Sequence, residues 1–356
     1  MNITERLNKR LQFSPQTTQL VYKLLSEIDT VKGQWKLSST LSPQMITRLQ
    51  VAVLVTSAGA STRIEGNKLT DVQVEKLLRG LNIKKLKTRD EQEVAGYLEL
   101  LKNIFNAWSK INLSESTILH FHQELLKYSE KDARQRGAYK FGPNRVEAKN
   151  SKGEIVGIVF DPTPPHLVKK EMEGLLAWTI AAIKQKDTHP LLVLANFIFE
   201  FLAIHPFQDG NGRLSRILTN FLLLKTGYDY VPYVSHEQLI EAKKIEYYIA
   251  LNKTQQTWKS QHENITPWAT YFLEILKQQS QKALTLLTQE AVEEFLSEKQ
   301  TMIWQFALQQ TTFSRGQVIA ATKLNARTVE HTIKKLVEMN KLERIGEGRA
   351  TRYKVK

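Results

Sequence analysis

Apolar residues recur at helical spacing along most of the chain, and this pattern predicts a mainly α-helical protein. Glycine and proline are sparse, 16 and 10 in 356 residues, so the places where they gather mark the ends of elements. The predicted helices cover about 44–65, several segments from 90 to 130, 168–186, 189–204, a helix from Arg213 to Gly227, and further segments up to about 297.

The pattern changes over residues 137–165, where glycines and prolines cluster. Two short runs typical of strands, "RVEAK" and "EIVGIVF", flank the turn sequence "NSKG" and predict a β-hairpin. Prolines at 162, 164 and 165 end the second strand and return the chain to helix. A single hairpin is therefore expected within an otherwise helical body.

The last sixty residues have an organisation of their own. Three helical segments are followed by two short strands around Gly346 and Gly348. The third helix carries one apolar stripe, at Val329, Ile333 and the pair 336–337. This order predicts a winged helix-turn-helix over 298–356.

The whole pattern predicts three regions, which are an N-terminal helical region over 1–100, a core over 101–297 that includes the hairpin, and the winged helix domain over 298–356.

Composition narrows the class of protein. A chain of this length forms two or three domains, and the absence of cysteine excludes disulfides and thiol catalysis. The longest apolar stretch, 191–204, has only fourteen residues and contains Asn196 and Glu200, so it predicts a buried helix and no membrane span. The first ten residues lack the apolar core of a signal peptide. A cytoplasmic protein without membrane association is expected.

Charge points to the C-terminal region. The net charge is +14, and residues 314–356 carry eleven Lys and Arg against four Asp and Glu. Half of the net charge therefore lies in 43 residues, which favours a polyanionic partner for that end. The alternative is a well-solvated surface with no partner.

The stretch "HPFQDGNGRLSR" (205–216) holds the candidate chemistry. Glycines on either side of Asn211, directly before a predicted helix, let backbone N–H groups converge where the helix dipole also attracts anions. Arg213 and Arg216 lie three residues apart at the start of that helix and are expected to share a face. Guanidinium groups match phosphate oxygens in a fork, so the pattern indicates a polyphosphate.

Two further residues of this stretch supply the remaining parts of phosphate-ester chemistry. Asp209 is placed to hold a hard cation such as Mg²⁺ that bridges phosphates. His205 has the one side chain here suited to proton abstraction near neutral pH. The structural alternative is a capped helix in which His205 and Asp209 only satisfy each other.

The stretch resembles the signature of the Fic family, His-Pro-Phe-x-Asp/Glu-Gly-Asn-Gly-Arg-x-x-Arg, at every fixed position. The resemblance implies a helical Fic core that transfers AMP from ATP to a Ser, Thr or Tyr hydroxyl of a target protein and releases pyrophosphate. It implies these roles by position: His205 as the base, Asp209 as the Mg²⁺ ligand, Gly210, Asn211 and Gly212 as the anion hole, Arg213 and Arg216 as clamps on the β and γ phosphates, and Phe207 as an anchor without chemistry.

The resemblance extends from about residue 40 to 270. The hairpin with the following "PTPPHL" is similar to the family's flap, a strand edge that aligns the backbone of a target. "YVSHEQLIEAKKIEYYIAL" resembles the segment that walls the adenine pocket, with Tyr247 and Tyr248 as candidates. Ordinary helix packing is the alternative for these tyrosines.

A second motif lies far upstream. Ser61-x-x-x-Glu65-Gly66 resembles the inhibitory helix of Fic proteins, here expected over about 44–66. The resemblance implies that Glu65 pairs with Arg216, so that this arginine cannot hold a γ-phosphate and ATP settles out of line. It also leaves open that Glu65 positions a water for removal of AMP.

Alternatives remain for the activity and the partners. The chain could be a DNA-binding regulator that uses a Fic core to sense nucleotide, or a Fic enzyme with another donor such as UTP. The winged helix could dock a protein and not DNA, and the sequence leaves open the target and whether a homodimer forms. His120 and His122 lie two apart on a predicted helix and cannot chelate one metal together. The residues expected to face duplex DNA are Asn325, Arg327, Thr328, His331 and Lys335 on the third helix, and Arg349 and Arg352 on the wing.

Overall fold

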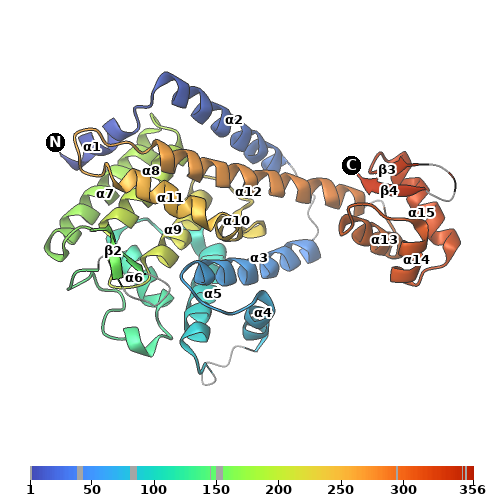
Figure 1. Ribbon diagram of the computed structural model, residues 1–356, viewed down its shortest axis with the longest axis horizontal. Helices are drawn as coiled ribbons and strands as arrows, with labels where there is room; N and C mark the ends of the chain where they lie inside the picture. Colours follow the sequence, from blue (N-terminus) through green and yellow to red (C-terminus); the bar gives the residue numbers. More distant parts are fainter. Residues whose placement is uncertain are drawn as a thin grey trace. The chain divides into compact units, whose positions relative to one another are not determined.

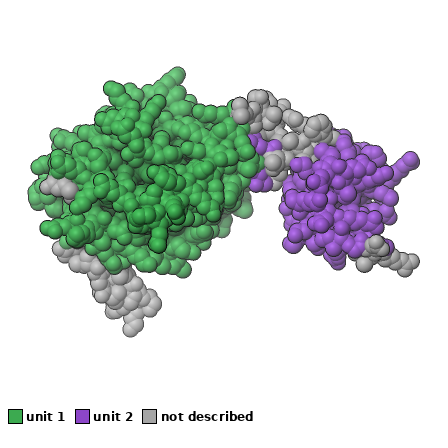
Figure 2. Space-filling model, turned by 90° about the horizontal axis from the view of Figure 1, so that it is seen from above, with its two compact units in different colours: residues 1–284 green, residues 285–356 purple. Residues whose placement is uncertain are grey.

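The fold comes from a computed structural model that describes residues 2–37, 43–80, 86–144, 146–149, 155–293, 296–346, 348 and 351–356. The described chain forms two compact units, residues 1–284 and 285–356 (Figure 2). The expected boundary at 298 is therefore too late. The division falls inside one long helix, which runs without a break across it, so the sequence carries no punctuation there.

The first unit is an assembly of helices, and the predicted mainly α-helical class is confirmed (Figure 1). Its longer helices are α1 (Ile3–Arg10), α2 (Pro15–Leu37), α3 (Pro43–Ile64), α4 (Asp71–Arg79), α5 (Arg89–Ala107), α6 (Glu115–Leu125), α7 (Pro165–Gln185), α8 (Pro190–Ile204), α9 (Asn211–Lys225), α10 (His236–Ala242), α11 (Lys244–Gln255) and α12 (Thr266–Glu293). Short 3₁₀ turns are η2 (Trp108–Lys110), η3 (Glu130–Asp132) and η4 (Val231–Tyr233).

Helix α8 lies in the core of this unit. Every residue from Leu191 to Ile204 is buried, as expected for a helix that is apolar all round. It packs against α7 and α9, and α9 in turn packs against α3, α5 and α6. The motif loop between α8 and α9 therefore starts and ends on two buried helices.

No helix in the described part of the chain is both long and apolar enough to cross a bilayer.

The predicted hairpin forms from β1 (Val146–Lys149) and β2 (Ile155–Phe160), which pair antiparallel with Val146 opposite Phe160. The predicted turn "NSKG" lies outside the described residues. After β2 the chain enters α7 with Pro165 at its first turn, a position where a missing N–H costs nothing. The end of β2 approaches α11, so the hairpin lies near the helix that carries Tyr247 and Tyr248.

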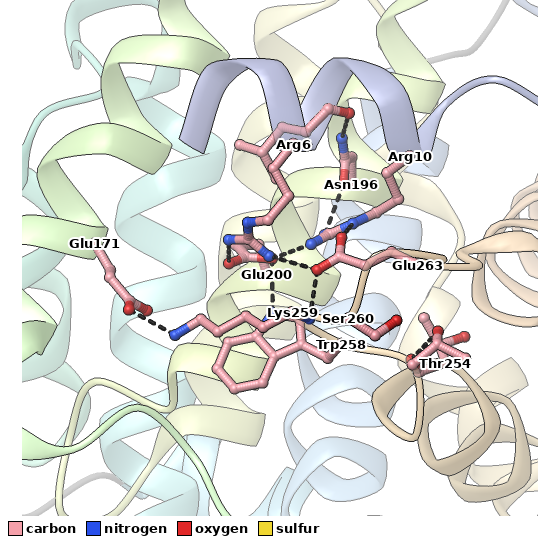
Figure 3. Close-up of polar contacts among 12 residues, drawn as sticks. Arg6, Arg10, Glu171, Asn196, Glu200, Thr254, Trp258, Lys259, Ser260 and Glu263 are labelled. Atoms are coloured by element: carbon pink, nitrogen blue, oxygen red, sulfur yellow. Dashed lines mark hydrogen bonds and ion pairs between the residues drawn. The ribbon is translucent and has the colours of Figure 1, made fainter. Parts of the chain in front are cut away.

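The N-terminal helix α1 is fastened to the core by buried ion pairs (Figure 3). Arg10 donates to Glu200 of α8 at 2.7 Å and to Glu263 at 2.7 Å, and Arg6 bonds the same two carboxylates. Asn196 accepts from Arg10 at 3.0 Å and donates to the carbonyl of Leu7 at 2.9 Å. Burial opposes the ionisation of Glu200, but the charges of Arg10 and Arg6 outweigh it and lower its pKa.

Helix α3 lies across α10, α5 and α9. Its C-terminal half is anchored on both sides. Ser57 donates to the buried carboxylate of Glu237 at 2.8 Å, and Arg63 forms ion pairs with Glu241 at 2.6 Å and Asp71 at 2.9 Å. Helix α3 ends at Ile64, close to the predicted stop, and the chain turns at Gly66 with φ +101°.

In the described part of the second unit, three helices and two antiparallel strands follow the end of α12 in the expected order. The helices are α13 (Glu298–Leu308), α14 (Arg315–Thr322) and α15 (Ala326–Glu338), and the strands are β3 (Leu342–Ile345) and β4 (Arg352–Val355). Val329, Ile333 and Leu336 of the predicted stripe are buried in the core of this unit, together with Phe313 and Trp304. The apolar stripe of α15 therefore packs the unit and leaves the opposite face of this helix to solvent.

Candidate active site

The motif stretch forms a tight loop between two helices. Helix α8 ends at Ile204, and His205 follows with φ 52° and ψ 60°, a left-handed conformation that is unfavourable for a residue other than glycine. Gly210, with φ +82°, precedes the first turn of α9. The predicted start of this helix at Arg213 is wrong by two residues, because Asn211 and Gly212 already belong to the helix. Their N–H groups lie in the first turn, where a helix leaves its donors without internal partners.

His205 is held in one tautomer. Its Nδ1 lies 3.2 Å from the carbonyl oxygen of Leu202, which can only accept, so Nδ1 carries the proton. The lone pair is therefore on Nε2, and the side chain lines a pocket. Burial lowers the pKa of His205 to about 4, and the nearby charge of Lys140 adds to this effect. The ring is uncharged at neutral pH and can accept a proton.

Asp209 is an ionised carboxylate at the start of α9. Its Oδ1 accepts from the N–H of Gly210 at 2.7 Å, and its Oδ2 accepts from Arg213 at 3.1 Å and Arg89 at 2.9 Å. Burial raises its pKa, but the charge of Arg213, the Gly210 N–H and Arg89 outweigh burial and lower it. No pattern in the sequence pointed to Arg89, which lies 120 residues upstream.

The donor set around Asp209 is compatible with Mg²⁺. Mg²⁺ in nucleotide sites usually takes one or two carboxylates and completes its coordination with phosphate oxygens and water. The Asp209 side chain is 35% exposed and lines the pocket, so one of its oxygens can serve as such a ligand. Arg213 and Arg89 then remain beside it as neutralising charges.

The two motif arginines take different partners. Arg213 is buried and lies 3.4 Å from Glu93 of α5 as well as close to Asp209. Arg216 is buried and directed to α3, where its Nε donates to Ser61 Oγ at 2.8 Å and its Nη2 donates to the Ser61 carbonyl at 2.9 Å. Of the pair, Arg213 is the one that lines the pocket.

Glu65 occupies the space between Arg216 and the anion site. Its Oε1 accepts from Arg216 Nη2 at 2.7 Å. A Cβ placed on Gly212 would lie 2.2 Å from this oxygen and 3.5 Å from Arg216 Nη1, so only glycine allows this approach. Arg216 Nη1 has no hydrogen-bond partner among the described residues. The Glu65 carboxylate thus lies against the first turn of α9, with Arg216 behind it.

The pocket at this place has a volume of about 300 Å³ and combines the motif with α11. Its walls are formed by Glu65, Leu202, His205, Gln208, Asp209, Gly210, Asn211, Gly212, Arg213, Tyr247, Tyr248, Leu251, Asn252 and Gln255. Tyr247 is buried, and burial raises its pKa to about 12, whereas Tyr248 is 44% exposed. The sequence analysis missed Leu251, Asn252 and Gln255, although they follow Tyr248 at helical spacing.

His122 has a larger part in this region than the sequence suggested. It is fully buried on α6, stacks on Phe207 with ring centroids 3.8 Å apart, and its Nε2 bonds the Asp209 carbonyl at 3.0 Å. Phe207 is itself fully buried, as expected for an anchor. His120, two residues away, takes no part in these contacts. Helix α6 therefore supports the motif loop through the contacts of His122.

Some of the residues expected to face DNA are exposed, and others form hydrogen bonds within the second unit. Arg327, His331 and Arg352 are exposed, while Thr328 and Lys335 are half-buried. Asn325 caps α15, with its Oδ1 accepting from the Thr328 N–H at 2.8 Å, so this side chain has a structural task. Lys335 bonds Gln300 at 3.4 Å. Arg349 lies outside the described residues.

Part of the chain, including the motif, is similar to known proteins. Residues 112–223 match the Fic/DOC family. A probable protein adenylyltransferase of Aquifex aeolicus is 31% identical over 121 residues, which is 33% of this chain and 37% of the relative. The protein adenylyltransferase Fic of Drosophila melanogaster is 31% identical over 170 residues, 47% of this chain and 32% of the relative. This chain therefore matches about a third of the length of these relatives.

Solved structures share the fold. A Fic family protein from Desulfovibrio desulfuricans superposes with a TM-score of 0.62 at 21% identity and covers 98% of both chains. Fic-1 from C. elegans superposes with a TM-score of 0.59 at 20% identity and covers 77% of this chain and 74% of its own. This chain and these solved structures therefore share a fold.

Proposed function

We propose that this chain is a Fic-type protein adenylyltransferase, which transfers AMP from ATP to a hydroxyl of a target protein. The observation that carries the proposal is the position of His205. His205, whose Nε2 is the acceptor nitrogen, lines the same pocket of about 300 Å³ as the first turn of α9 and Arg213. A base beside an anion site is the arrangement that phosphoryl-group transfer to a hydroxyl requires. The names of the curated relatives support the same activity.

In this proposal each residue of the pocket has one task. Nε2 of His205 takes the proton of a Ser, Thr or Tyr hydroxyl, and the hydroxyl oxygen attacks the α-phosphorus. The bond to the β-phosphate oxygen breaks, and pyrophosphate leaves. The N–H groups of Asn211 and Gly212 and the guanidinium of Arg213 stabilise the charge on the phosphates. Tyr247 and Tyr248 wall the adenine. Bound Mg²⁺ on Asp209 would neutralise phosphate charge.

We also propose that Glu65 inhibits the transfer. Arg216 is the clamp for the γ-phosphate, and its unpartnered Nη1 beside Gly212 supports this role. While Glu65 holds Nη2 at 2.7 Å and occupies the space against Gly212, ATP binds with its α-phosphate out of line. Correct alignment contributes several kcal/mol to the rate of such reactions, so one ion pair is enough to suppress transfer. Glu65 is also a candidate for positioning water in the removal of AMP.

The test of the activity uses Glu65→Gly, in which inhibition is relieved, and Glu65→Gly/His205→Ala. Each variant is incubated with cell lysate and ATP labelled on the α-phosphate, and the label on protein is measured. Loss of a positioned base lowers the rate on the order of a hundredfold or more, while ATP affinity stays nearly unchanged. Transfer at equal rates by both variants would exclude His205 as the base. Labelled UTP in a parallel reaction tests the alternative donor.

We further propose that the second unit is a winged helix domain that binds duplex DNA. The face of α15 opposite its core stripe exposes Arg327 and His331, and β4 exposes Arg352. Residues 314–356 carry a net charge of +7. A regulator that senses nucleotide with its Fic core would use the same surface. A protein-docking module is the alternative.

Binding of the full-length chain to a labelled duplex at two salt concentrations tests the DNA role. Contacts with phosphates release counterions, so affinity must fall steeply as salt rises. Arg327→Ala should weaken binding, and Lys102→Ala at an exposed position of α5 is the matched control. Absence of binding to any duplex at low salt would favour protein docking.

A further inference from the structure

The main chain of the motif loop is held by hydrogen bonds from outside the motif. Every backbone carbonyl from Ile204 to Phe207 accepts a bond from the segment that precedes β1, and the carbonyl of Asp209 accepts one from α6. These bonds come from only three residues, Lys140, Asn144 and His122. The loop is therefore held at almost every peptide by four side-chain bonds and one backbone bond from residues that lie 60 or more positions away in the sequence.

Asn144 is the centre of this arrangement. Its Nδ2 donates to the carbonyl of His205 at 3.1 Å and to the carbonyl of Phe207 at 2.6 Å. Its Oδ1 accepts from Lys140 Nζ at 2.6 Å. Because an ammonium group only donates and a carbonyl only accepts, these contacts allow one orientation of the amide. One side chain thus joins the carbonyls of the two residues on either side of Pro206.

Lys140 supports Asn144 and the same loop. The side chain is 4% exposed, and its Nζ also donates to the carbonyl of Ile204 at 3.2 Å, while its own N–H donates to the carbonyl of Pro206 at 2.9 Å. A lysine this deeply buried is rare unless its donors are used. Burial lowers its pKa to about 8 despite Asp161 and Glu171 nearby. The Lys140 ammonium group therefore serves as a hydrogen-bond donor that is held between Asn144 and the Ile204 carbonyl.

The loop needs such support because His205 has an unfavourable backbone conformation. Its left-handed φ of 52° is maintained only where surrounding contacts over-determine it. The carbonyl of His205 itself is one of the two groups that Asn144 holds. If that bond is lost, His205 can relax toward an ordinary conformation, and its Nε2 then moves away from the place where the pocket receives a hydroxyl.

We propose that Asn144, oriented by Lys140, is the positioning residue that keeps His205 in its reactive geometry. The inference rests on the function proposed above for His205, and it concerns a residue that neither lines the pocket nor belongs to the motif. It predicts a specific kinetic signature. The turnover number depends on the placement of the base, whereas nucleotide binding depends on α9 and Arg213, which Asn144 does not contact.

The decisive variant is Asn144→Asp in the Glu65→Gly background. Aspartate has the same size and keeps the contact with Lys140, but it can no longer donate to the two carbonyls. A displacement of the base by about 1 Å costs on the order of a hundredfold in rate. We expect kcat for self-modification, or for modification of lysate protein, to fall at least about tenfold, while the Kd for ATP stays within about twofold. Asn106→Asp, the same change at an exposed position of α5, is the control and should leave both values unchanged.

A second measurement does not require activity. Hydrogen exchange of the peptide spanning 204–210 should become faster in Asn144→Asp than in the parent, and exchange in α2 should not change. Should Asn144→Asp fail to fold, Asn144→Ala removes the same bonds without adding a charge and takes its place.

The outcomes separate this inference from the proposed function. If Glu65→Gly transfers nucleotide and Asn144→Asp transfers at the same rate, the positioning role is wrong. It is equally wrong if exchange of 204–210 is unaltered in a folded variant. If Glu65→Gly transfers no nucleotide, the proposed function fails, and the exchange measurement alone decides whether Asn144 holds the loop.

Discussion

Two arginine–carboxylate clusters fasten N-terminal helices to the core, and they differ in their access to solvent. In the first, Arg10 of α1 is 1% exposed and meets Glu200, whose side chain is completely buried. In the second, Arg216 is 2% exposed but meets Glu65, the residue directly after α3, whose side chain remains 35% exposed at the wall of a pocket. Among the described residues, the carboxylates that pair with Arg6 and Arg10 are those of Glu200 and Glu263. The second adjoins a space that a phosphate can enter.

The difference indicates which ion pair holds the fold together and which one can be exchanged. Removing one partner of a fully buried pair leaves the other charge desolvated and without compensation. A carboxylate at a pocket wall can move into water, and a phosphate can then replace it on the same guanidinium. α1 is therefore expected to be permanently docked, whereas the contact between α3 and α9 can be broken during function. Four predictions test this comparison.

The largest effect on stability is expected at the buried cluster of Arg6, Arg10, Glu200 and Glu263. Glu200→Gln keeps the size of the side chain but leaves Arg6 and Arg10 with only Glu263 as a counter-charge. The free energy of unfolding should fall by about 3–5 kcal/mol. Calorimetry measures the loss, and transfer by the folded fraction should not change, because the cluster does not line the pocket. A loss below about 1 kcal/mol would show that water reaches the charges of this cluster.

The second effect is expected at the open pair and has the opposite sign for activity. Glu65→Gly frees Arg216 and should raise transfer on the order of ten- to a hundredfold over the parent chain, since each 1.4 kcal/mol of alignment is a factor of ten. Glu65→Gln, which keeps the size and removes the charge, should raise it as well. Assays at equal ATP and Mg²⁺ give the comparison. Equal rates in parent and variants would leave Glu65 as a residue that only ends α3.

The third prediction concerns the buried side chain of His236, whose pKa is lowered because burial outweighs the charge of its neighbour Glu237. Burial lowers the pKa of His236, although Glu237 favours its charged form and Arg216 opposes it. The unfolded chain binds a proton near pH 6.5, so the stability contributed by neutral His236 is complete above that pH and is lost as pH falls below it, by about 1.4 kcal/mol per pH unit. His236→Phe should flatten this slope in denaturant titrations from pH 7.5 to 5.5. An unchanged slope would assign the acid sensitivity to other groups.

The smallest effect is expected for an arginine pair on the surface. Arg79 and Glu75 lie one turn apart on α4 with side chains 77% and 42% exposed. Arg79→Ala should change the free energy of unfolding by less than about 0.5 kcal/mol, because water already solvates both groups. The same calorimetry measures it beside Glu200→Gln. A loss comparable with that of Glu200→Gln would remove burial as the cause of the difference.

Local patterns were sufficient for much of the fold. The helical periodicity of 189–204, the prolines before α7 and Gly66 after α3 mark elements that the structure places within a few residues of the predicted positions. Such signals depend on backbone conformation and on the burial of one segment, which neighbouring residues largely decide. The boundary at 298 failed because α12 continues through the division with no local change.

In the candidate site, the sequence alone indicated the reactive groups, whereas the tertiary structure decided which residues contact them. His205, Asp209 and the arginines lie within twelve residues, so their order alone indicated a phosphate site. Arg89, His122 and Asn144 contact that loop from segments 60 to 120 residues away and have no pattern of their own. A contact of this kind depends on how helices pack, and packing brings together side chains that no spacing in the sequence relates. The sequence determined which groups can do chemistry, and only the fold decided which residues hold them in place.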